Sequence, residues 1–130
     1  MKILKILEAN KALADLNNKD INVKLGYWAS KLKRKLETEI KDYRESIFKL
    51  QKKYCELDKK GMPKTDEKGA VIFKDGVLEK FSEERDSLLE EDIKINTFPK
   101  IKLSYLLLED SLQGNIIHAL GELIKEDVKE

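Results

Sequence analysis

The stretch that decides the fold is INVKLGYWASKLKRKLETEIKDYRESIFKLQKKYCEL, residues 21–57. Its apolar residues recur at intervals of three and four, and from Leu36 onward they follow the a and d positions of a heptad repeat. The stretch contains no proline and has one glycine, near its start. It therefore predicts one long amphipathic helix. We call its apolar side the heptad face, and the residues of this face are Leu32, Leu36, Ile40, Tyr43, Ile47, Leu50, Tyr54 and Leu57.

Such a helix would be on the order of 50 Å long, at about 1.5 Å per residue. A chain of 130 residues cannot cover a helix of that length with one compact core. We therefore expect the heptad face to pair with a second helix, either the one predicted over residues 77–91 or the same helix in a second copy of the chain. In the second case the protein would be a homo-oligomer.

Shorter patterns predict the segments on either side of the long helix. Residues 1–16 are typical of a short amphipathic helix, and Asp20 or Asn22 is expected to cap the long helix that follows. Residues 59–76 hold three glycines and several turn residues around a short apolar run. This composition predicts a turn-rich insert with a small β-hairpin, and no internal repeat is evident.

The C-terminal half is expected to return to helix. Apolar spacing predicts helices over residues 77–91 and 106–125, with an extended segment over 92–103 between them. The predicted fold class is therefore mainly α with a small β element. It is a long helical hairpin or coiled coil, with a short β-hairpin and a packed C-terminal helix, in a single domain covering residues 1–130.

Composition narrows the classes of function. Charged residues make up 39% of the chain, against about 25% in an average soluble domain, yet 26 Lys and Arg balance 25 Asp and Glu to leave a net charge of +1. That balance does not favour binding to nucleic acid through phosphates. The single cysteine cannot form an intramolecular disulfide, and no segment has the length and apolarity of a membrane span. We expect a cytoplasmic protein without membrane contact.

Residues with catalytic or ligand-binding chemistry occur singly. His118 is the only histidine and Cys55 the only thiol, and neither has a base or a second metal ligand near it in the sequence. The adjacent acidic residues, such as Glu83 and Glu84, lack the pattern of a calcium loop and are typical of a solvated helix face. We predict no catalytic residue, no metal site and no cofactor, and hence a protein that is not an enzyme.

One short segment of the long helix combines aromatic and basic residues. Such a combination can bind a partner protein, and it can also meet RNA, DNA or an anionic surface. Glu37 and Glu39 follow at once, and Trp28 falls where the apolar side of the helix needs a residue, so a structural role is the simpler explanation. The candidate partner-binding residues are Tyr27, Trp28, Lys31, Arg34 and Lys35.

Two stretches resemble a known group of proteins. They are ILKILEANKALADLNNKDINVKLGYWASKLKRKLETEIKDYRESIFKLQKKY, residues 3–54, and IKINTFPKIKLSYL, residues 93–106. With the turn-rich insert between them, they resemble a family of uncharacterised small proteins from tailed bacteriophages and prophages of Gram-positive bacteria. The resemblance implies phage origin and action in the host cytoplasm or in a virion. It supplies no catalytic residues.

The sequence thus predicts a non-catalytic, protein-binding protein of phage origin that acts stoichiometrically on a partner protein. An inhibitor of a host defence system or of a host enzyme is the concrete form of this hypothesis. The alternative is a structural or assembly factor, which would self-associate through the heptad face. A second alternative is nucleic-acid binding through residues 27–35.

Overall fold

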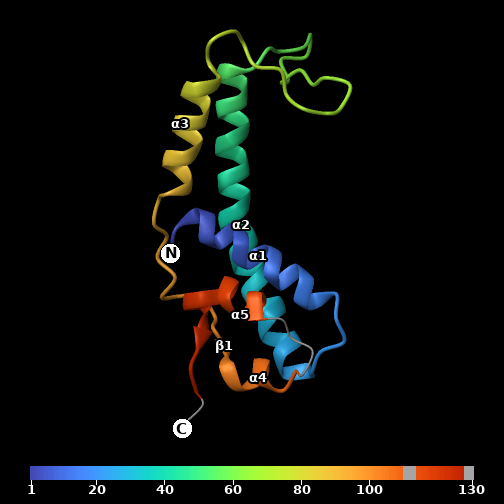
Figure 1. Ribbon diagram of the computed structural model, residues 1–130, viewed down its shortest axis with the longest axis vertical. Coiled ribbons are helices and arrows are strands. Elements are labelled where there is room, and N and C mark those ends of the chain that lie inside the picture. The colour runs from blue at the N-terminus through green and yellow to red at the C-terminus, as the bar shows by residue number, and fades with distance from the viewer. Residues whose placement is uncertain (110–113, 128–130) are drawn as a thin grey trace. The chain divides into compact units, whose positions relative to one another are not determined.

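The structure, a computed structural model, describes residues 1–109 and 114–127 (Figure 1). It is mainly helical, with one small sheet of two parallel strands. The elements are α1 (Ile3–Asn17), α2 (Val23–Tyr54), α3 (Leu78–Leu89), β1 (Ile101–Lys102), α4 (Leu103–Leu107), α5 (Gly114–Leu120), a 3-10 helix (Gly121–Leu123) and β2 (Ile124–Lys125).

The chain divides into two compact units. The first unit comprises Met1–Ile40 and Asp92–Glu130, and the second comprises Lys41–Glu91. The division falls within α2, whose backbone continues through it. Whether the two units fold together as one domain therefore stays a prediction.

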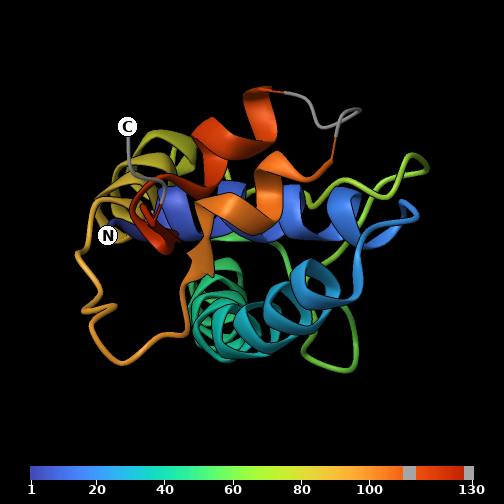
Figure 2. The same ribbon diagram turned by 90° about the horizontal axis from the view of Figure 1, so that it is seen from below.

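Helix α1 provides one wall of the core of the first unit. Its buried side chains recur at intervals of three and four, as an amphipathic helix requires, and include Ile6, Ala9 and Leu13. The small alanines allow α5 to pack directly on α1, and Figure 2 shows α1 between α5 and the early turns of α2. Helix α5 thus supplies the packed C-terminal helix that the sequence predicts.

Helix α2 begins where the sequence predicts a cap. The side-chain Oδ1 of Asn22 accepts a hydrogen bond from the backbone N–H of Leu25 at 2.9 Å, which satisfies one of the unpaired donors of the first turn. The Asn22 side chain also donates to the carbonyl oxygen of Tyr105 at 3.1 Å and to Oε1 of Glu109 at 2.8 Å. The cap therefore also ties the start of α2 to the end of α4.

The early part of the heptad face is buried in the core of the first unit. Leu32, Leu36 and Ile40 are at most 2% exposed, and they pack in one cluster with residues of α1 and of the C-terminal segments. In this unit, the long hairpin is thus formed by α1 and α2. The other residues of this core are Ile6, Ala9, Ala12, Leu13, Leu16, Leu25, Ala29, Ile101, Leu106, Ile116, Leu120 and Leu123.

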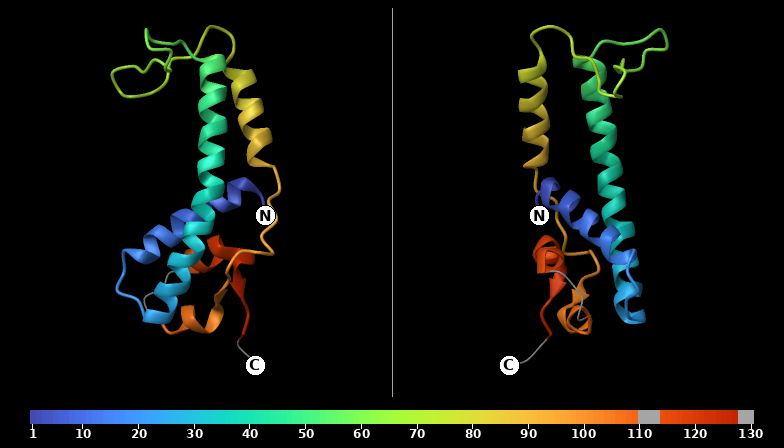
Figure 3. Two further views of the ribbon diagram at one scale, coloured as in Figure 1. Left: turned by 180° about the vertical axis from the view of Figure 1, so that it is seen from behind. Right: turned by 45° about the vertical axis from the view of Figure 1, so that its right-hand side comes forward.

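In the second unit, α3 runs alongside the later turns of α2 (Figure 3). The ring of Phe81 on α3 lies edge-on to Tyr54 and to Phe73, with centroids 6.5 Å and 4.8 Å away. Two helices cover each other on one side only, so the later heptad residues Tyr43 and Ile47 are half-buried. The apolar packing of this unit is concentrated at the end where α2 leads into the insert.

The insert between α2 and α3 is a closed triangle of three extended segments. Three backbone hydrogen bonds close the triangle. The N–H of Glu56 donates to the carbonyl oxygen of Ile72 at 2.8 Å, and the N–H of Ile72 donates to the carbonyl oxygen of Lys64 at 2.9 Å. The N–H of Lys64 donates in turn to the carbonyl oxygen of Glu56 at 2.7 Å. Isolated antiparallel bridges join each segment to the other two. We call residues 54–74 the tip.

An eight-residue repeat builds the tip, although none was evident from the sequence. Oδ1 of Asp58 accepts hydrogen bonds from the backbone N–H groups of Lys60 and Met62, which lie two and four residues later in the chain. Oδ1 of Asp66 accepts the equivalent hydrogen bonds from Lys68 and Ala70. Gly61 and Gly69 each lie three residues after the aspartate with φ of 76° and 83°, a conformation that glycine adopts without steric cost.

The prediction of a β-hairpin as the β element is wrong. The only strand pair in the described part of the chain is the parallel one between β1 and β2, in which Ile101 lies opposite Ile124. The chain reverses every eight residues in the tip, so each segment meets the other two through one bridge apiece. A continuous two-stranded ladder therefore does not form there.

The C-terminal segment also differs from the predicted single helix over residues 106–125. Helix α4 begins earlier, at Leu103, and thereby shortens the extended segment predicted over 92–103. Residues 110–113 of the predicted helix lie outside the described residues. Helix α5 ends before Gly121, whose φ of 47° leaves the right-handed helical region, and the chain then forms β2 beside β1.

Candidate functional site

Four of the five candidate residues are exposed on the first turns of α2. Tyr27 is 56% exposed, and Lys31, Arg34 and Lys35 are exposed as well, whereas Trp28 is half-buried against the core. The residues on the opposite side of the same turns, among them Ala29, are buried. Burial of that side fixes the rotation of the helix, so the basic residues must point outward.

The aromatic residues and Lys31 form a small stacked group. The rings of Tyr27 and Trp28 meet edge-to-face, with centroids 5.3 Å apart and planes at 88°. The Nζ of Lys31 lies 5.3 Å from the Tyr27 centroid and 5.2 Å from that of Trp28, within the range of a cation–π contact. The contact orders the lysine while its charge stays at the surface.

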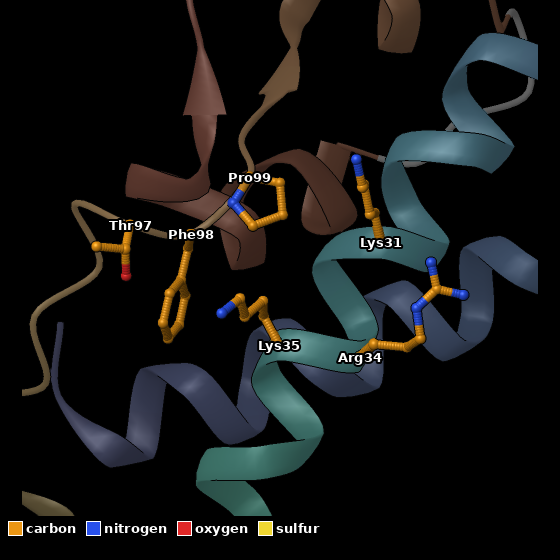
Figure 4. A pocket seen from close by; sticks show the side chains of 6 residues that line it. All are labelled: Lys31, Arg34, Lys35, Thr97, Phe98 and Pro99. Carbon is orange, nitrogen blue, oxygen red and sulfur yellow. The ribbon is translucent and has the colours of Figure 1, made fainter.

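An open hollow of about 500 Å³ lies beside these residues, lined by Lys31, Arg34, Lys35, Thr97, Phe98 and Pro99. Figure 4 shows the side chain of Lys35 reaching toward Phe98, while that of Arg34 points away from it. Phe98 is half-buried against the core, and its backbone N–H closes a turn by donating to the carbonyl of Ile95 at 3.0 Å. We call Tyr27, Trp28, Lys31, Arg34, Lys35 and Phe98 the basic–aromatic surface.

Thr97, Phe98 and Pro99 were not predicted to belong to this site. They lie more than sixty positions from Lys31 and Arg34 in the sequence, and their approach depends on how residues 92–100 cross the first unit. The nearest signal in the sequence is the Phe-Pro pair, which interrupts an extended segment. That pair predicts a turn but gives no information on which helix the turn contacts.

The lining of the hollow is basic and partly apolar. Its six lining residues include three cations and no carboxylate, so the hollow attracts anionic groups. Phe98 and Pro99 add an apolar wall. The nearby carboxylate of Glu37 forms an ion pair with Lys33 on an adjacent side of the helix. The lining contains no nucleophile paired with a base, as covalent catalysis requires.

The lone histidine and the lone cysteine lie in different units. His118 is exposed on α5 in the first unit. Cys55 is fully buried at the start of the tip, and burial raises the pKa of its thiol. A thiol of raised pKa is a weaker nucleophile at neutral pH because less thiolate is present.

Metal-ligand clusters and membrane-spanning helices are both absent from the described residues. Over residues 1–109 and 114–127, no three His, Cys, Asp or Glu side chains are grouped so that they could hold a metal ion. Among the helices in these ranges, none is long and apolar enough to cross a membrane.

Comparisons of the chain with protein-family models, curated proteins and solved structures give no significant match.

Proposed function

We propose that this chain is a non-catalytic protein that acts by binding a partner protein through the basic–aromatic surface. The observation that carries the proposal is the grouping of Lys31, Arg34 and Lys35 around an open hollow with an apolar wall, beside the exposed ring of Tyr27. Tyrosine, tryptophan and arginine are the residues that most often dominate the binding energy of protein interfaces.

The partner that fits this surface is an acidic segment with at least one large apolar side chain. Its carboxylates would pair with Lys31, Arg34 and Lys35, and its apolar side chain would lie against Phe98 and Pro99. The helix turns beneath the surface are fixed by fully buried side chains, so the surface is largely ordered before binding. Pre-ordering lowers the conformational entropy that binding costs.

The concrete form of the proposal is a phage protein that works in the cytoplasm of an infected bacterium. There it would occupy one site on a host defence protein or a host enzyme and inhibit it stoichiometrically. The phage origin rests on the resemblance of residues 3–54 and 93–106 to small phage proteins. The stoichiometric action rests on the chemistry of the hollow, which offers charges and an apolar wall but no reactive pair.

An affinity capture with matched variants tests this proposal. The whole chain is immobilised and exposed to a lysate of a Gram-positive bacterium, and captured proteins are identified by mass spectrometry. The double variant Lys31→Glu/Lys35→Glu should lose a protein that the wild type retains. The control Lys59→Glu/Lys60→Glu makes the same change of charge at exposed positions of the tip and should retain it. Equal capture by all three proteins would contradict the proposal.

Nucleic-acid binding through residues 27–35 is the second candidate. The observation that favours it is the position of Lys31 over the rings of Tyr27 and Trp28, since aromatic rings beside cations also form stacking platforms for single-stranded nucleic acid. A fluorescent single-stranded RNA should then show a salt-dependent anisotropy change that is lost in Lys31→Glu/Lys35→Glu. The absence of any change at low salt would exclude this candidate.

A further inference from the structure

The second unit carries a basic hollow on α2. The hollow measures about 490 Å³ and is lined along one side of the helix by Lys41, Arg44, Glu45, Phe48, Lys49 and Lys52. The ring of Phe48 is half-buried, and the Nζ of Lys52 lies 4.7 Å from its centroid. From residue 41 to residue 54 the helix holds five cations and two carboxylates, a net charge of +3.

The same unit carries an acidic stripe on α3. Glu79, Glu83 and Asp86 are exposed along α3 at spacings of four and three residues, and the exposed Glu90 directly follows the last residue of the helix. Asp86 also receives a hydrogen bond from the neighbouring Arg85 at 3.2 Å. Residues 78–91 hold six carboxylates and two cations, a net charge of −4.

The hollow and the stripe are equal in length and opposite in charge. The hollow extends from Lys41 to Lys52 and the stripe from Glu79 to Glu90, so in each case the last residue lies eleven positions after the first. At about 1.5 Å per residue, each is about 16 Å long. An acidic helix of this kind therefore offers carboxylates along the whole length of the hollow.

The hollow and the stripe lie on opposite edges of the second unit. Each residue turns a helix by about 100°, which places Phe48 and Lys52 on the side of α2 away from Tyr54, whose ring lies edge-on to Phe81 of α3. By the same rotation, Glu79 and Glu83 lie on the side of α3 away from Phe81, which contacts α2. One unit therefore cannot bring its own stripe into its own hollow.

We propose that the basic hollow of one copy binds the acidic stripe of a second copy. Because each copy carries the two surfaces on opposite edges, the contact is heterologous, and successive copies add head-to-tail into rings or open chains. The contact is distinct from self-association through the heptad face and independent of the basic–aromatic surface. Its ion pairs are exposed, so association is weak and is screened by salt.

Sedimentation velocity of the whole chain tests the proposal. In about 0.1 M salt, the weight-average mass should rise with concentration. In about 1 M salt it should fall toward that of the monomer, because the Debye length shortens from about 10 Å to about 3 Å. The variants Lys41→Glu/Lys52→Glu and Glu79→Lys/Glu83→Lys should each stay monomeric alone. Their equimolar mixture should associate, because each then offers the charge that the other needs.

Three results would overturn the proposal. The first is a wild-type chain that stays monomeric up to about 1 mM, where a contact with a Kd of about 1 mM would be half formed. The second is an association that 1 M salt leaves intact, as expected of apolar heptad packing. The third is a folded variant pair whose mixture stays monomeric. The controls Lys59→Glu/Lys60→Glu and Lys31→Glu/Lys35→Glu should associate as the wild type does.

Circular dichroism establishes whether each variant is folded before it is compared. All of the changed side chains are exposed, so large losses of stability are not expected. The change in the weight-average mass of the wild type with salt and concentration needs no variant. This measurement therefore decides the proposal even if one of the variants fails to fold. The variant Lys31→Glu/Lys35→Glu distinguishes the two proposals. It should lose capture of the partner protein but should still self-associate, so either proposal can fail without the other.

Discussion

The heptad face is covered unequally along α2, and matched truncations should measure the difference. Leu36 is fully buried in the first unit, and Leu50 is half-buried in the second. Leu36→Ala removes apolar atoms from contact with the core and leaves a cavity, so it should lower the free energy of unfolding by about 2–5 kcal/mol. Full burial of a leucine side chain contributes about 1.5–3 kcal/mol, and Leu50 is only half-buried. Leu50→Ala should therefore lower the free energy of unfolding by about 1 kcal/mol.

Urea denaturation followed by far-UV circular dichroism measures both losses. If the two units unfold together, each variant should shift the midpoint without changing the slope, and the shift for Leu36→Ala should be at least twice that for Leu50→Ala. If the units unfold separately, each variant should shift only the transition of its own unit. Equal shifts, or a loss of less than about 0.5 kcal/mol for Leu36→Ala, would refute the unequal burial of the heptad face.

Three further predictions concern the tip, the thiol and one carboxylate. Gly69→Ala should destabilise the chain by about 1 kcal/mol in the same denaturation assay, because φ is 83° there; an unchanged midpoint would contradict the turn geometry. Cys55 is buried and the pKa of its thiol is raised, so labelling by a disulfide reagent at neutral pH should be slow until urea unfolds the chain; rapid labelling of the folded chain would count against this burial. Hydrogen bonds from Ser104 lower the pKa of Asp127. The stabilisation that these bonds give the folded chain is therefore complete at a pH above the ordinary pKa of 3.8, and it is lost as the pH falls through the lower pKa of the folded state. In an NMR titration, Ser104→Ala should raise the pKa of Asp127.

Local patterns in the sequence predicted the helices with the strongest signals. Regular apolar spacing located α2 to within three residues at each end, and Asn22, one of two predicted caps, does cap it. The heptad spacing also predicted that the apolar face needs another helix. It could not identify that helix, since α1, α3 and a second copy of α2 all present apolar sides of similar spacing.

The remaining features depend on contacts between distant residues or on single backbone angles. The tip forms because Glu56, Lys64 and Ile72 exchange backbone hydrogen bonds, and backbone pairing leaves little trace in side-chain types. The glycines of the tip are typical of turn residues, but two copies of an eight-residue period are too few to indicate a repeat in the sequence. Phe98 joins the basic–aromatic surface only through the path of residues 92–100, which no local pattern specifies.

Site-specific photo-crosslinking tests the proposed partner-binding surface most directly. A benzophenone amino acid is placed at Tyr27, which is 56% exposed on that surface, or at Leu78, which is 55% exposed on α3. After irradiation in a bacterial lysate, Tyr27 should yield a covalent adduct with one host protein, and Lys31→Glu/Lys35→Glu should abolish it. An adduct that forms equally from Leu78, or that survives the charge reversal, would contradict partner binding through this surface.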